Sequence, residues 1–337
     1  KIYLHGNNKL PYELEFALDH KVGSIVVDGY SELDLIDQMC AERGMVQNIL
    51  LRINPGVEAH THRFIQTAKT DSKFGFSVAD GTAEKITQYA LTKKHVHLAG
   101  YHCHIGSQIV EKQSFLLAVD KMMAFIAEIG KKYSFETEVL NLGGGYGIWY
   151  TDEDAKFSCA DYADYLKAII RELKAKSQGY GVRSPFLVVE PGRSIVGEAG
   201  VTLYTVGAIK EIPGIKKYVA VDGGMFDNPR YALYQAKYTA ILANRAAEKP
   251  TEVVSVAGKC CESGDLVCAD VSLPKAESGD ILAVLSTGAY NYSMASNYNR
   301  NFIPPVVLVK DGKAEYIVKP QTFEDLVRND VIPDRLK

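Results

Sequence analysis

The chain has 337 residues, enough for one large α/β domain and a smaller companion domain. It is 47% hydrophobic and 23% charged with a net charge of −3, so its composition favours neither nucleic acid nor an anionic membrane surface as a partner. A small molecule is the expected ligand. The six cysteines lack a C-x-x-C metal motif and the density of a secreted disulfide scaffold, which favours a cytoplasmic protein.

The first part of the chain alternates short apolar runs with segments of helical periodicity, the pattern of βαβ units. Apolar residues between Phe115 and Ile129, for example, recur at helical spacing and need a sheet face to cover them. The runs predict six parallel strands, over residues 2–5, 25–28, 49–54, 98–104, 139–142 and 186–190.

Polar residues or glycines follow most of these strands, where the functional residues of a (β/α)8 barrel lie. A closed barrel of this type has eight strands, whereas six would leave two open edges. We therefore expect the first two βα units to precede Lys1. The sequence predicts an α/β fold whose first domain, residues 1–196, is a TIM-type barrel that lacks these two units.

After residue 196 the chain is rich in β-branched runs and tight turns, which predicts a C-terminal antiparallel β domain over residues 197–337. The pair Asp311-Gly312 is typical of a hairpin, and Thr322 with Asp325 predicts a capped helix over 322–328. The strands of this domain are predicted at 201–209, 218–221, 253–257, 281–285, 306–310 and 315–318.

Two strand-end motifs suggest anion chemistry. Gly143-Gly144-Gly145 can expose backbone N–H groups to a phosphate, although three glycines after a strand are often only a tight turn. Glu190 and Arg193 flank a Pro-Gly pair, and alone they would indicate a surface ion pair. At a barrel mouth, however, the carboxylate can keep a pyridine nitrogen protonated and the guanidinium can bind a carboxylate through two hydrogen bonds.

Further candidates occur singly along the chain. His102 and His104 would share one strand face, but such histidines are more often core residues, and a metal site on this pair lacks an obvious third ligand, so no metal is predicted. Arg230 and Tyr234 are four apart and would share one helix face and one substrate anion. Tyr290 follows a Gly-Ala turn, where a buried tyrosine of a β domain is the alternative.

The segment 258–265 places the Cys261 thiol beside the Glu262 carboxylate in a Gly-flanked turn, which makes a proton donor available. In chain order, the motifs His-Gly-Asn, His-Ile-Gly-Ser-Gln, Gly-Gly-Gly, Glu-Pro-Gly-Arg, Asp-Gly-Gly, Cys-Glu-Ser-Gly-Asp and Gly-Ala-Tyr resemble those of fold type III pyridoxal phosphate decarboxylases, specifically the diaminopimelate decarboxylase family. The match runs from Ile2 to about Arg328. Cys261-Glu262-Ser263 is among its most discriminating parts, because relatives that act on ornithine or arginine carry an Asp-bearing motif after the cysteine.

The resemblance implies pyridoxal 5′-phosphate as the cofactor. Glu190 would pair with the pyridine nitrogen and His104 would stack on the ring, both as catalytic residues. The remaining cofactor-binding residues, most of them at the phosphate, would be Ser107, Gly143, Gly144, Gly145, Gly192, Arg193 and Tyr290.

The resemblance also implies a substrate site shared between two subunits. Cys261, contributed across a homodimer interface, would be the acid that returns a proton to the substrate. The substrate, an amino acid, would be bound by Arg193, Arg230, Tyr234, Glu262 and Tyr290.

The implied reaction is decarboxylation of meso-2,6-diaminopimelate to L-lysine and CO2, the last step of lysine biosynthesis. The family's Schiff-base lysine lies on the first barrel strand in a Tyr-x-x-Lys-Ala-Asn setting that no lysine of this sequence has, and we expect it in the preceding units. The alternatives are a decarboxylase of another basic or carrier-linked amino acid, or a lysine-free homologue that acts as a regulatory binding protein. A racemase of the same barrel is less favoured, because its second base is normally a tyrosine.

Overall fold

The computed structural model describes residues 2–57 and 73–337. The chain divides into two compact units. Unit 1 comprises the described residues up to Gly147 together with Lys156–Gly192, and unit 2 comprises Ile148–Ala155 together with Arg193–Lys337.

The division differs from the sequence-based boundary after residue 196, because residues 148–155 and 193–196 belong to unit 2. Packing explains the difference. Ile148 and Tyr150 are buried in the hydrophobic core of unit 2, and the Tyr150 carbonyl accepts the backbone N–H of Thr239 at 3.0 Å. A short apolar segment inside the first domain's sequence is thus part of the second domain's core.

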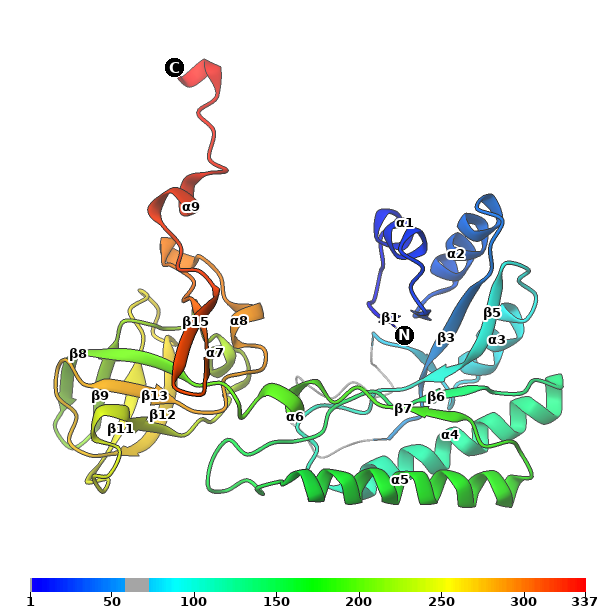
Figure 1. Ribbon diagram of the computed structural model, residues 1–337, viewed down its shortest axis with the longest axis horizontal. Helices are drawn as coiled ribbons and strands as arrows, with labels where there is room; N and C mark the ends of the chain where they lie inside the picture. Colours follow the sequence, from blue (N-terminus) through cyan, green and yellow to red (C-terminus); the bar gives the residue numbers. More distant parts are fainter. Residues whose placement is uncertain (1, 58–72) are drawn as a thin grey trace. The chain divides into compact units, whose positions relative to one another are not determined.

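Unit 1 contains a sheet of seven strands in the order β1-β2-β3-β5-β6-β7, with β4 paired to β3 (Figure 1). All of its pairings are parallel, which confirms the predicted βαβ organisation. Within the described residues β1 and β7 do not pair with each other, so the sheet forms an open part of a barrel. The strands are β1 (Tyr3–Leu4), β2 (Ser24–Val27), β3 (Gln47–Asn54), β4 (Phe76–Ser77), β5 (Val96–His102), β6 (Val139–Asn141) and β7 (Phe186–Val188).

The sheet is buried on both faces, as expected for parallel strands. Ile25 and Ile49 belong to the large core between the sheet and the helices, whereas their neighbours Val26 and Leu50 form a smaller cluster with Ala99. Successive residues of one strand therefore enter different hydrophobic clusters, the period of two that a β-strand imposes. The two-residue strand β4 was not predicted, because it is too short to show any alternation.

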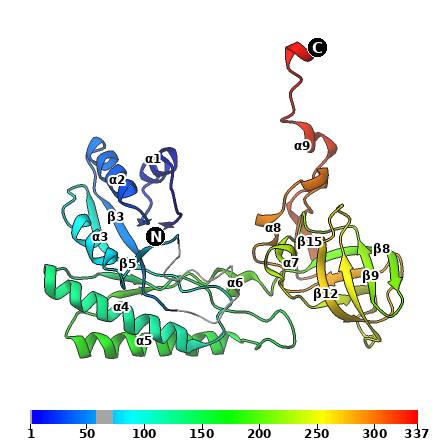
Figure 2. The same cartoon turned by 180° about the vertical axis from the view of Figure 1, so that it is seen from behind.

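The helices of unit 1 provide the cover that the strands need. In Figures 1 and 2, the two longest helices, α4 and α5, lie side by side along the sheet. The predicted apolar stripe of α4 is buried, including Phe115, Val119 and Ile126. Helix α5 begins at a capping box in which Ser158 and Asp161 exchange hydrogen bonds. The helices are α1 (Pro11–Asp19), α2 (Tyr30–Glu42), α3 (Thr82–Ala90), α4 (Lys112–Tyr133) and α5 (Cys159–Tyr180).

Unit 2 contains a six-stranded sheet in the order β10-β13-β8-β9-β11-β12 and a separate hairpin of β14 and β15. The predicted antiparallel arrangement holds for every pair except β9 and β11, which run parallel. This part of the prediction was wrong, because the long connection between β9 and β11 lets the chain return in the same direction. The strands are β8 (Thr202–Ile212), β9 (Lys216–Val221), β10 (Ala240–Leu242), β11 (Glu252–Ala257), β12 (Leu266–Leu273), β13 (Ile281–Val284), β14 (Val306–Lys310) and β15 (Lys313–Val318).

Two strands of unit 2 were not predicted. β10 is only three residues long, and β12 contains Asp270 at φ 53°, a left-handed residue that interrupts the alternation within the strand. The hairpin at Asp311 and Gly312 is confirmed, with φ of 52° and 74° as a two-residue turn of this type requires. The short helices are α6 (Gly192–Val196), α7 (Arg230–Tyr234), α8 (Asn291–Met294) and α9 (Phe323–Val327) with 3-10 turns at Ala243–Arg245, Tyr298–Arg300 and Asp334–Leu336.

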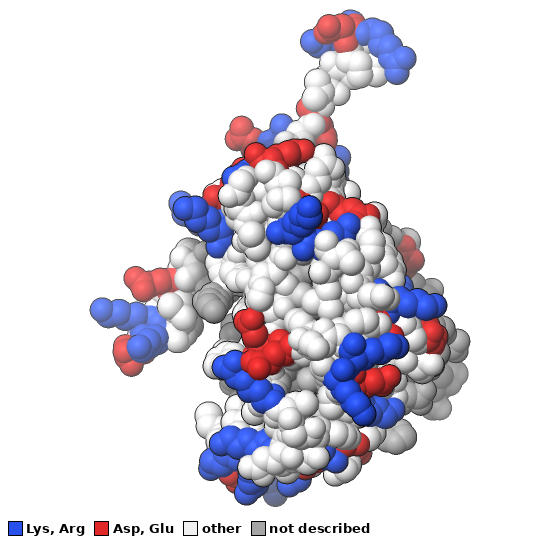
Figure 3. Space-filling model, turned by 90° about the vertical axis from the view of Figure 1, so that its right-hand side faces the viewer, with Lys and Arg blue, Asp and Glu red and all other residues white. Residues whose placement is uncertain are grey.

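The surface carries charges of both signs. On the face drawn in Figure 3, lysines and arginines are interspersed with aspartates and glutamates.

The cap predicted for α9 is confirmed, since Thr322 accepts the N–H of Asp325. None of the helices in the described ranges combines the length and the apolar character that crossing a bilayer requires.

Candidate functional site

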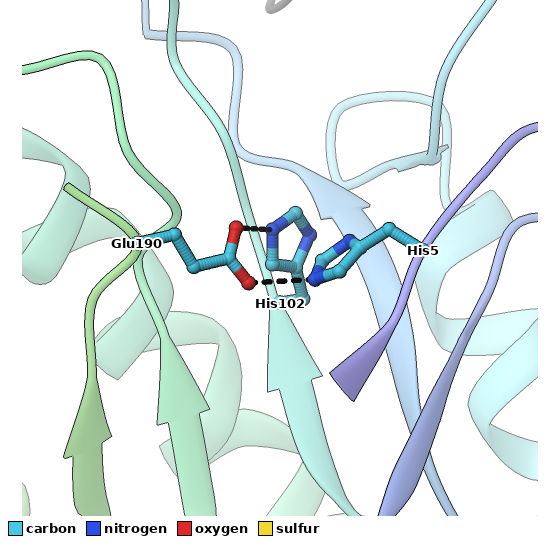
Figure 4. A group of neighbouring side chains, drawn as sticks. All are labelled: His5, His102 and Glu190. Atoms are coloured by element: carbon cyan, nitrogen blue, oxygen red, sulfur yellow. Dashed lines mark hydrogen bonds and ion pairs between the residues drawn. The ribbon is translucent and has the colours of Figure 1, made fainter. Parts of the chain in front are cut away.

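Three side chains from different strand ends meet in unit 1 (Figure 4). His5 follows β1, His102 ends β5, and Glu190 follows β7. His5 Nε2 lies 2.6 Å from Glu190 Oε1, which also accepts the side-chain N–H of Asn141 at 2.8 Å. His102 Nε2 lies 3.6 Å from the other carboxylate oxygen, Oε2. The carboxyl ends of parallel strands share one sheet edge, so residues far apart in sequence converge there.

The environment sets the charge of this group. Burial by itself would raise the pKa of Glu190, but interactions with His102 and His5 outweigh it and hold the pKa well below its usual range. Burial lowers the pKa of His102 to about 4, and it lowers the pKa of His104 to about 4 as well, with Arg52 adding to the effect. At neutral pH the Glu190 carboxylate is therefore ionised, and the imidazoles of His102 and His104 are uncharged.

His104 has a different neighbour from His102. β5 ends at His102, so the alternation that was expected to place the two on one face stops there. His104 Nδ1 accepts the backbone N–H of Gly144 at 3.3 Å. Among the described residues, the group that satisfies the distances of a metal site is His5, His102 and Glu190, whose ligand atoms lie within 4.8 Å of one another. The histidine pair considered from the sequence, His102 and His104, is thus not the pair of this group: His5 replaces His104, and the third member is Glu190, the residue implied to bind a cofactor.

The loop that carries His5 is fixed by a buried lysine. Lys9 Nζ donates to the carbonyls of Gly6 and Val26 at 2.7 and 2.8 Å and lies 2.8 Å from the Glu32 carboxylate. These three acceptors match the three protons of an ammonium group. Lys9 therefore acts as an anchor of the strand-end loop.

The glycine loop after β6 packs directly on the neighbouring strand ends. A Cβ on Gly144 would come within 2.2 Å of the Glu190 carbonyl oxygen, and one on Gly145 within 2.1 Å of the Gly106 carbonyl oxygen. Gly143 and Gly145 also have positive φ, of 68° and 98°. No larger residue fits here without moving the backbone. The glycines thus bring the loop that carries Ser107, which is half-buried, against the loop that carries Glu190.

The last residue of unit 1 is also close to Glu190 in the chain. Gly192, an exposed residue at the start of α6, donates its N–H to the Glu190 carbonyl at 2.9 Å. The motif Glu190-Pro191-Gly192-Arg193 therefore contributes to both units, since Arg193 belongs to unit 2.

In unit 2 two arginines converge on one tyrosine. The guanidinium carbon of Arg193 lies 4.7 Å from the ring centroid of Tyr290, and that of Arg230 lies 5.3 Å from it. Both arginines are buried, and each bonds a further tyrosine: Arg193 contacts the Tyr150 hydroxyl, and Arg230 donates to the Tyr238 hydroxyl at 2.7 Å. Two neighbouring cations at one aromatic ring form a site suited to anions.

The backbone at this cluster is unusual. Tyr290 has φ 73° and ψ −41°, a conformation that costs free energy for a residue with a side chain and is found mostly at functional sites. Arg230 and Tyr234 both lie on α7, with the guanidinium 5.6 Å from the Tyr234 ring, as their spacing predicted. Tyr290, Arg193, Arg230 and Tyr234 thus form one cluster, which we call the arginine cluster.

Cys261 and Glu262 lie in the turn between β11 and β12, and both are exposed. The Tyr298 hydroxyl donates to the Glu262 carboxylate. The adjacent Cys260 differs from Cys261, because it is half-buried and its pKa is raised to about 11, by burial first and then by the Asp265 carboxylate. Of the two neighbouring thiols, Cys261 is therefore the accessible one.

Sequence reasoning missed several contributors to these sites. His5 was recognised as a strand-end residue but not as the partner of Glu190, and Tyr150, Tyr238 and Tyr298 were not singled out. Only the position of His5 at the end of a predicted strand gave a usable signal. The tyrosines carry no local signal, since their roles depend on residues distant in the chain.

Known proteins share this sequence and fold. Residues 1–197 match the family described as "Pyridoxal-dependent decarboxylase, pyridoxal binding domain". Diaminopimelate decarboxylase of Bacillus subtilis is 51% identical over 98% of this chain and 75% of its own length, and that of Bacillus methanolicus is 53% identical over 95% and 73%. The structure of diaminopimelate decarboxylase from M. jannaschii in complex with L-lysine has a TM-score of 0.89 and 39% identity, covering 100% of this chain and 76% of that one.

The residues of unit 1 fit pyridoxal phosphate. Glu190 offers an ionised carboxylate that is one-third exposed, and the glycine loop presents its backbone with no side chains in the way. Both ring nitrogens of His102 are buried, and the 3.6 Å contact of Nε2 with Glu190 Oε2 is longer than an ordinary hydrogen bond, so these nitrogens can still bond a further polar group. The chain belongs to the diaminopimelate decarboxylase family of pyridoxal phosphate-dependent decarboxylases.

Proposed function

We propose that this chain converts meso-2,6-diaminopimelate to L-lysine and CO2, with the cofactor held by unit 1 and the substrate recognised by the arginine cluster and the Cys261–Glu262 turn. The observation that carries the proposal is the ionised Glu190 carboxylate, which lies between His5 and His102 in a domain that matches the pyridoxal-binding family. The neighbour from M. jannaschii was crystallised with L-lysine, the product that this reaction would release.

Pyridoxal phosphate, when bound, withdraws electrons from the substrate carbon that loses CO2. The chain's own task is to keep that capacity high. A carboxylate whose pKa is depressed, as that of Glu190 is, stays ionised and favours a protonated pyridine nitrogen beside it. We assign His104 to the ring face, and Ser107 with Gly143, Gly144 and Gly145 to the phosphate.

The charges of unit 2 complement the substrate. Diaminopimelate has a carboxylate and an ammonium group at each end. Arg193 and Arg230 can bind carboxylates through paired hydrogen bonds, and Tyr234 and Tyr290 add hydroxyl groups beside them. Glu262 supplies a negative charge for the distal ammonium group, and its hydrogen bond from Tyr298 fixes its orientation. A substrate with a shorter or uncharged distal end would leave these groups unpaired, at a cost in free energy.

We assign Cys261 as the acid that returns a proton to the carbon from which CO2 departs. Its exposure leaves the thiol free to enter the active site of a second subunit, and we therefore propose that the enzyme works as a homodimer. All six cysteines of the chain, each within the described residues, are free thiols, which supports a reducing cytoplasm as its location.

The test is product analysis on the purified protein with added pyridoxal phosphate. Diaminopimelate should yield lysine and CO2 in equal amounts, whereas ornithine, arginine and lysine should react far more slowly. Replacing Glu262 with Gln should raise KM for diaminopimelate, and Glu324→Gln, at an exposed position on α9, is the matched control. Preference for a substrate without a distal ammonium group would contradict the assignment.

A further inference from the structure

The segments of unit 2 that carry substrate residues meet at one edge of its sheet. Residues 222–229 follow β9 and lead into α7, which begins with Arg230, while residues 258–265 follow β11 and carry Cys261 and Glu262. β9 and β11 pair in parallel, with Ala220 opposite Ala257, so both segments leave the sheet at the same end. The parallel pairing that the sequence did not predict therefore places the two segments side by side.

A single buried carboxylate joins the two segments. Asp265 is 3% exposed. Its Oδ1 accepts the backbone N–H of Met225 at 2.6 Å, and its Oδ2 accepts the backbone N–H of Cys260 at 2.7 Å. One oxygen thus bonds each segment, and the Cys260 N–H immediately precedes Cys261. Hydrogen bonds to an ionised acceptor are about twice as strong as neutral ones and are directional.

The surrounding glycines are consistent with this role. A Cβ on Gly258 would lie 2.3 Å from both Asp265 carboxylate oxygens, and one on Gly224 would lie 2.7 Å from the nearer oxygen. Glycine at each position leaves the space that the carboxylate occupies. The backbone adds one more link between the segments, since Lys259 donates its N–H to the Gly223 carbonyl at 3.1 Å.

Asp265 is bonded by backbone and not by a cation. Within the described residues it forms no salt bridge, whereas Asp280, a buried aspartate at another turn of unit 2, pairs with Arg245 at 3.1 Å. A carboxylate held by two backbone N–H groups fixes the spacing of the two segments that supply them. The far side of the turn is held separately, by the bond from Tyr298 to Glu262.

We propose that Asp265 is a positioning residue: by bonding Met225 and Cys260 it holds the Cys261–Glu262 turn at a fixed distance from the segment that leads into Arg230. The inference rests on the proposed function, since it assigns the alignment of groups on both segments to one buried carboxylate. It also gives the two adjacent cysteines different roles, because burial and then the neighbouring Asp265 carboxylate raise the pKa of the Cys260 thiol, whereas Cys261 is exposed.

The test compares Asp265→Asn with Asp280→Asn. An amide at 265 can accept only one of the two N–H groups and turns its own NH2 toward the other, so the turn loses its link to one segment. Asp280→Asn is the matched control, because Asp280 is also buried and accepts a backbone N–H, from Glu277 at 2.8 Å, but its turn carries no substrate residue. Both variants are checked for folding by circular dichroism.

We expect Asp265→Asn to lower kcat/KM for diaminopimelate by about 100-fold, with KM raised as well as kcat lowered, since a displacement of about 1 Å has an effect of this size. Asp280→Asn should leave both constants within about twofold of the parent. A loss in kcat/KM of the same size in both variants would show that Asp265 has only a structural role and would overturn the proposal.

A second measurement does not depend on catalysis. The protein is treated with iodoacetamide without cofactor, and the labelling of Cys260 relative to Cys261 is measured by peptide fragmentation. Removing the charge at 265 should raise this ratio at least about threefold. Forming the Cys260 thiolate, the form that reacts with iodoacetamide, then costs less free energy. Asp280→Asn should not change it. An unchanged ratio in folded Asp265→Asn would overturn the proposal even if the protein decarboxylated another substrate.

Should Asp265→Asn fail to fold, Gly258→Ala supplies the second variant. Its new methyl group would displace the carboxylate without removing its charge. The same rise in KM is expected, and parent-like kinetics in this variant would count against the proposal. Failure of the parent itself to act on diaminopimelate would concern the proposed function alone, because the labelling ratio would still report on Asp265.

Discussion

Unit 1 and unit 2 position their functional side chains by different means. In unit 1, His102 and Glu190 meet because they end neighbouring parts of one parallel sheet, whose register is set by backbone pairing. In unit 2, Arg230 and Glu262 lie on a five-residue helix and a turn, and single buried side chains such as Asp265 hold those segments. The first arrangement depends on close backbone packing and the second on a few hydrogen bonds, so the two units should respond differently to substitution and pH.

The largest effect is expected from Glu190→Gln in unit 1. A glutamine cannot carry the charge that favours a protonated pyridine nitrogen, so kcat should fall about 1,000-fold, the size of effect seen when one preorganised electrostatic partner is removed. The measurement is kcat for diaminopimelate together with the affinity for pyridoxal phosphate by equilibrium dialysis.

Glu138→Gln is the matched control for that variant. Glu138 also accepts from a histidine, His97, at 2.8 Å, but this pair is exposed to solvent. The Glu138→Gln variant should therefore have a kcat and a cofactor affinity close to those of the parent protein. A parent-like kcat in Glu190→Gln would show that the Glu190 charge does not contribute to the reaction. It would also contradict the assignment of the cofactor site to unit 1.

The same contrast explains what could be predicted from the sequence. In unit 1 six of the seven strands were predicted from their apolar runs, and sheet geometry then placed the residues at their ends along one edge. That reasoning brought Glu190 and Gly143 to the barrel mouth. It could not show that His5 is the hydrogen-bond partner of Glu190, because 185 residues separate them and their contact depends on the curvature of the sheet.

In unit 2 the local patterns predicted elements but not their partners. The Asp311-Gly312 hairpin and the Thr322 cap are confirmed, because each involves residues within a few positions of one another. The parallel pairing of β9 with β11 was missed, and with it the role of Asp265, whose partner Met225 lies 40 residues earlier. A carboxylate beside a glycine gives no sign of the distant N–H group that it will accept.

The next effect tests the packing of unit 1. Gly144→Ala should destabilise the fold by on the order of 3 kcal/mol or more, because its Cβ would lie 2.2 Å from the Glu190 carbonyl oxygen and the backbone must move. Gly179→Ala, in α5 with no atom within 4 Å of the added Cβ, should instead stabilise by about 0.5 kcal/mol. Urea unfolding followed by circular dichroism measures both, and equal effects would show that the glycine loop is not closely packed.

A third effect is the pH dependence of unit 1. Burial lowers the folded-state pKa of His102 to about 4 from an ordinary 6.5, so the folded state binds fewer protons than the unfolded state in this range. The contribution of His102 to the free energy of unfolding is therefore complete above pH 6.5 and is lost as the pH falls through 4. The change is roughly 3 kcal/mol.

His102→Gln, which does not titrate, should remove this share of the acid-induced loss. His104 keeps its own share, since its pKa is also lowered to about 4, so the variant should still lose some stability in acid. Circular dichroism reports mainly on unit 1, because α4 and α5 are 22 residues each and the helices of unit 2 are far shorter. An unchanged acid transition in His102→Gln would show that this histidine is not buried in its uncharged form.

The smallest expected effect is the pH dependence of the stability of unit 2, which should have the opposite sign to that of unit 1. Burial raises the pKa of Asp227 to about 6 from 3.8, although hydrogen bonds from Tyr204 and the Gly224 N–H oppose the rise. Here the folded state holds its proton more tightly than the unfolded state, so stability falls as the pH rises from about 4 to 6, by at most about 3 kcal/mol.

Asp227→Asn should remove that fall, because an asparagine can accept the Gly224 N–H through its oxygen while the Tyr204 hydroxyl accepts from its NH2 group. Trp149 is the only tryptophan of the chain and belongs to unit 2, so its fluorescence reports on this unit while circular dichroism reports on unit 1. Between pH 4 and 6 the parent protein should therefore show a falling urea midpoint by fluorescence and a rising one by circular dichroism. Midpoints that move together would mean that the two units unfold as one. The difference between unit 1, whose site depends on backbone pairing, and unit 2, whose segments are held by single side chains, would then not appear in the stability of the units.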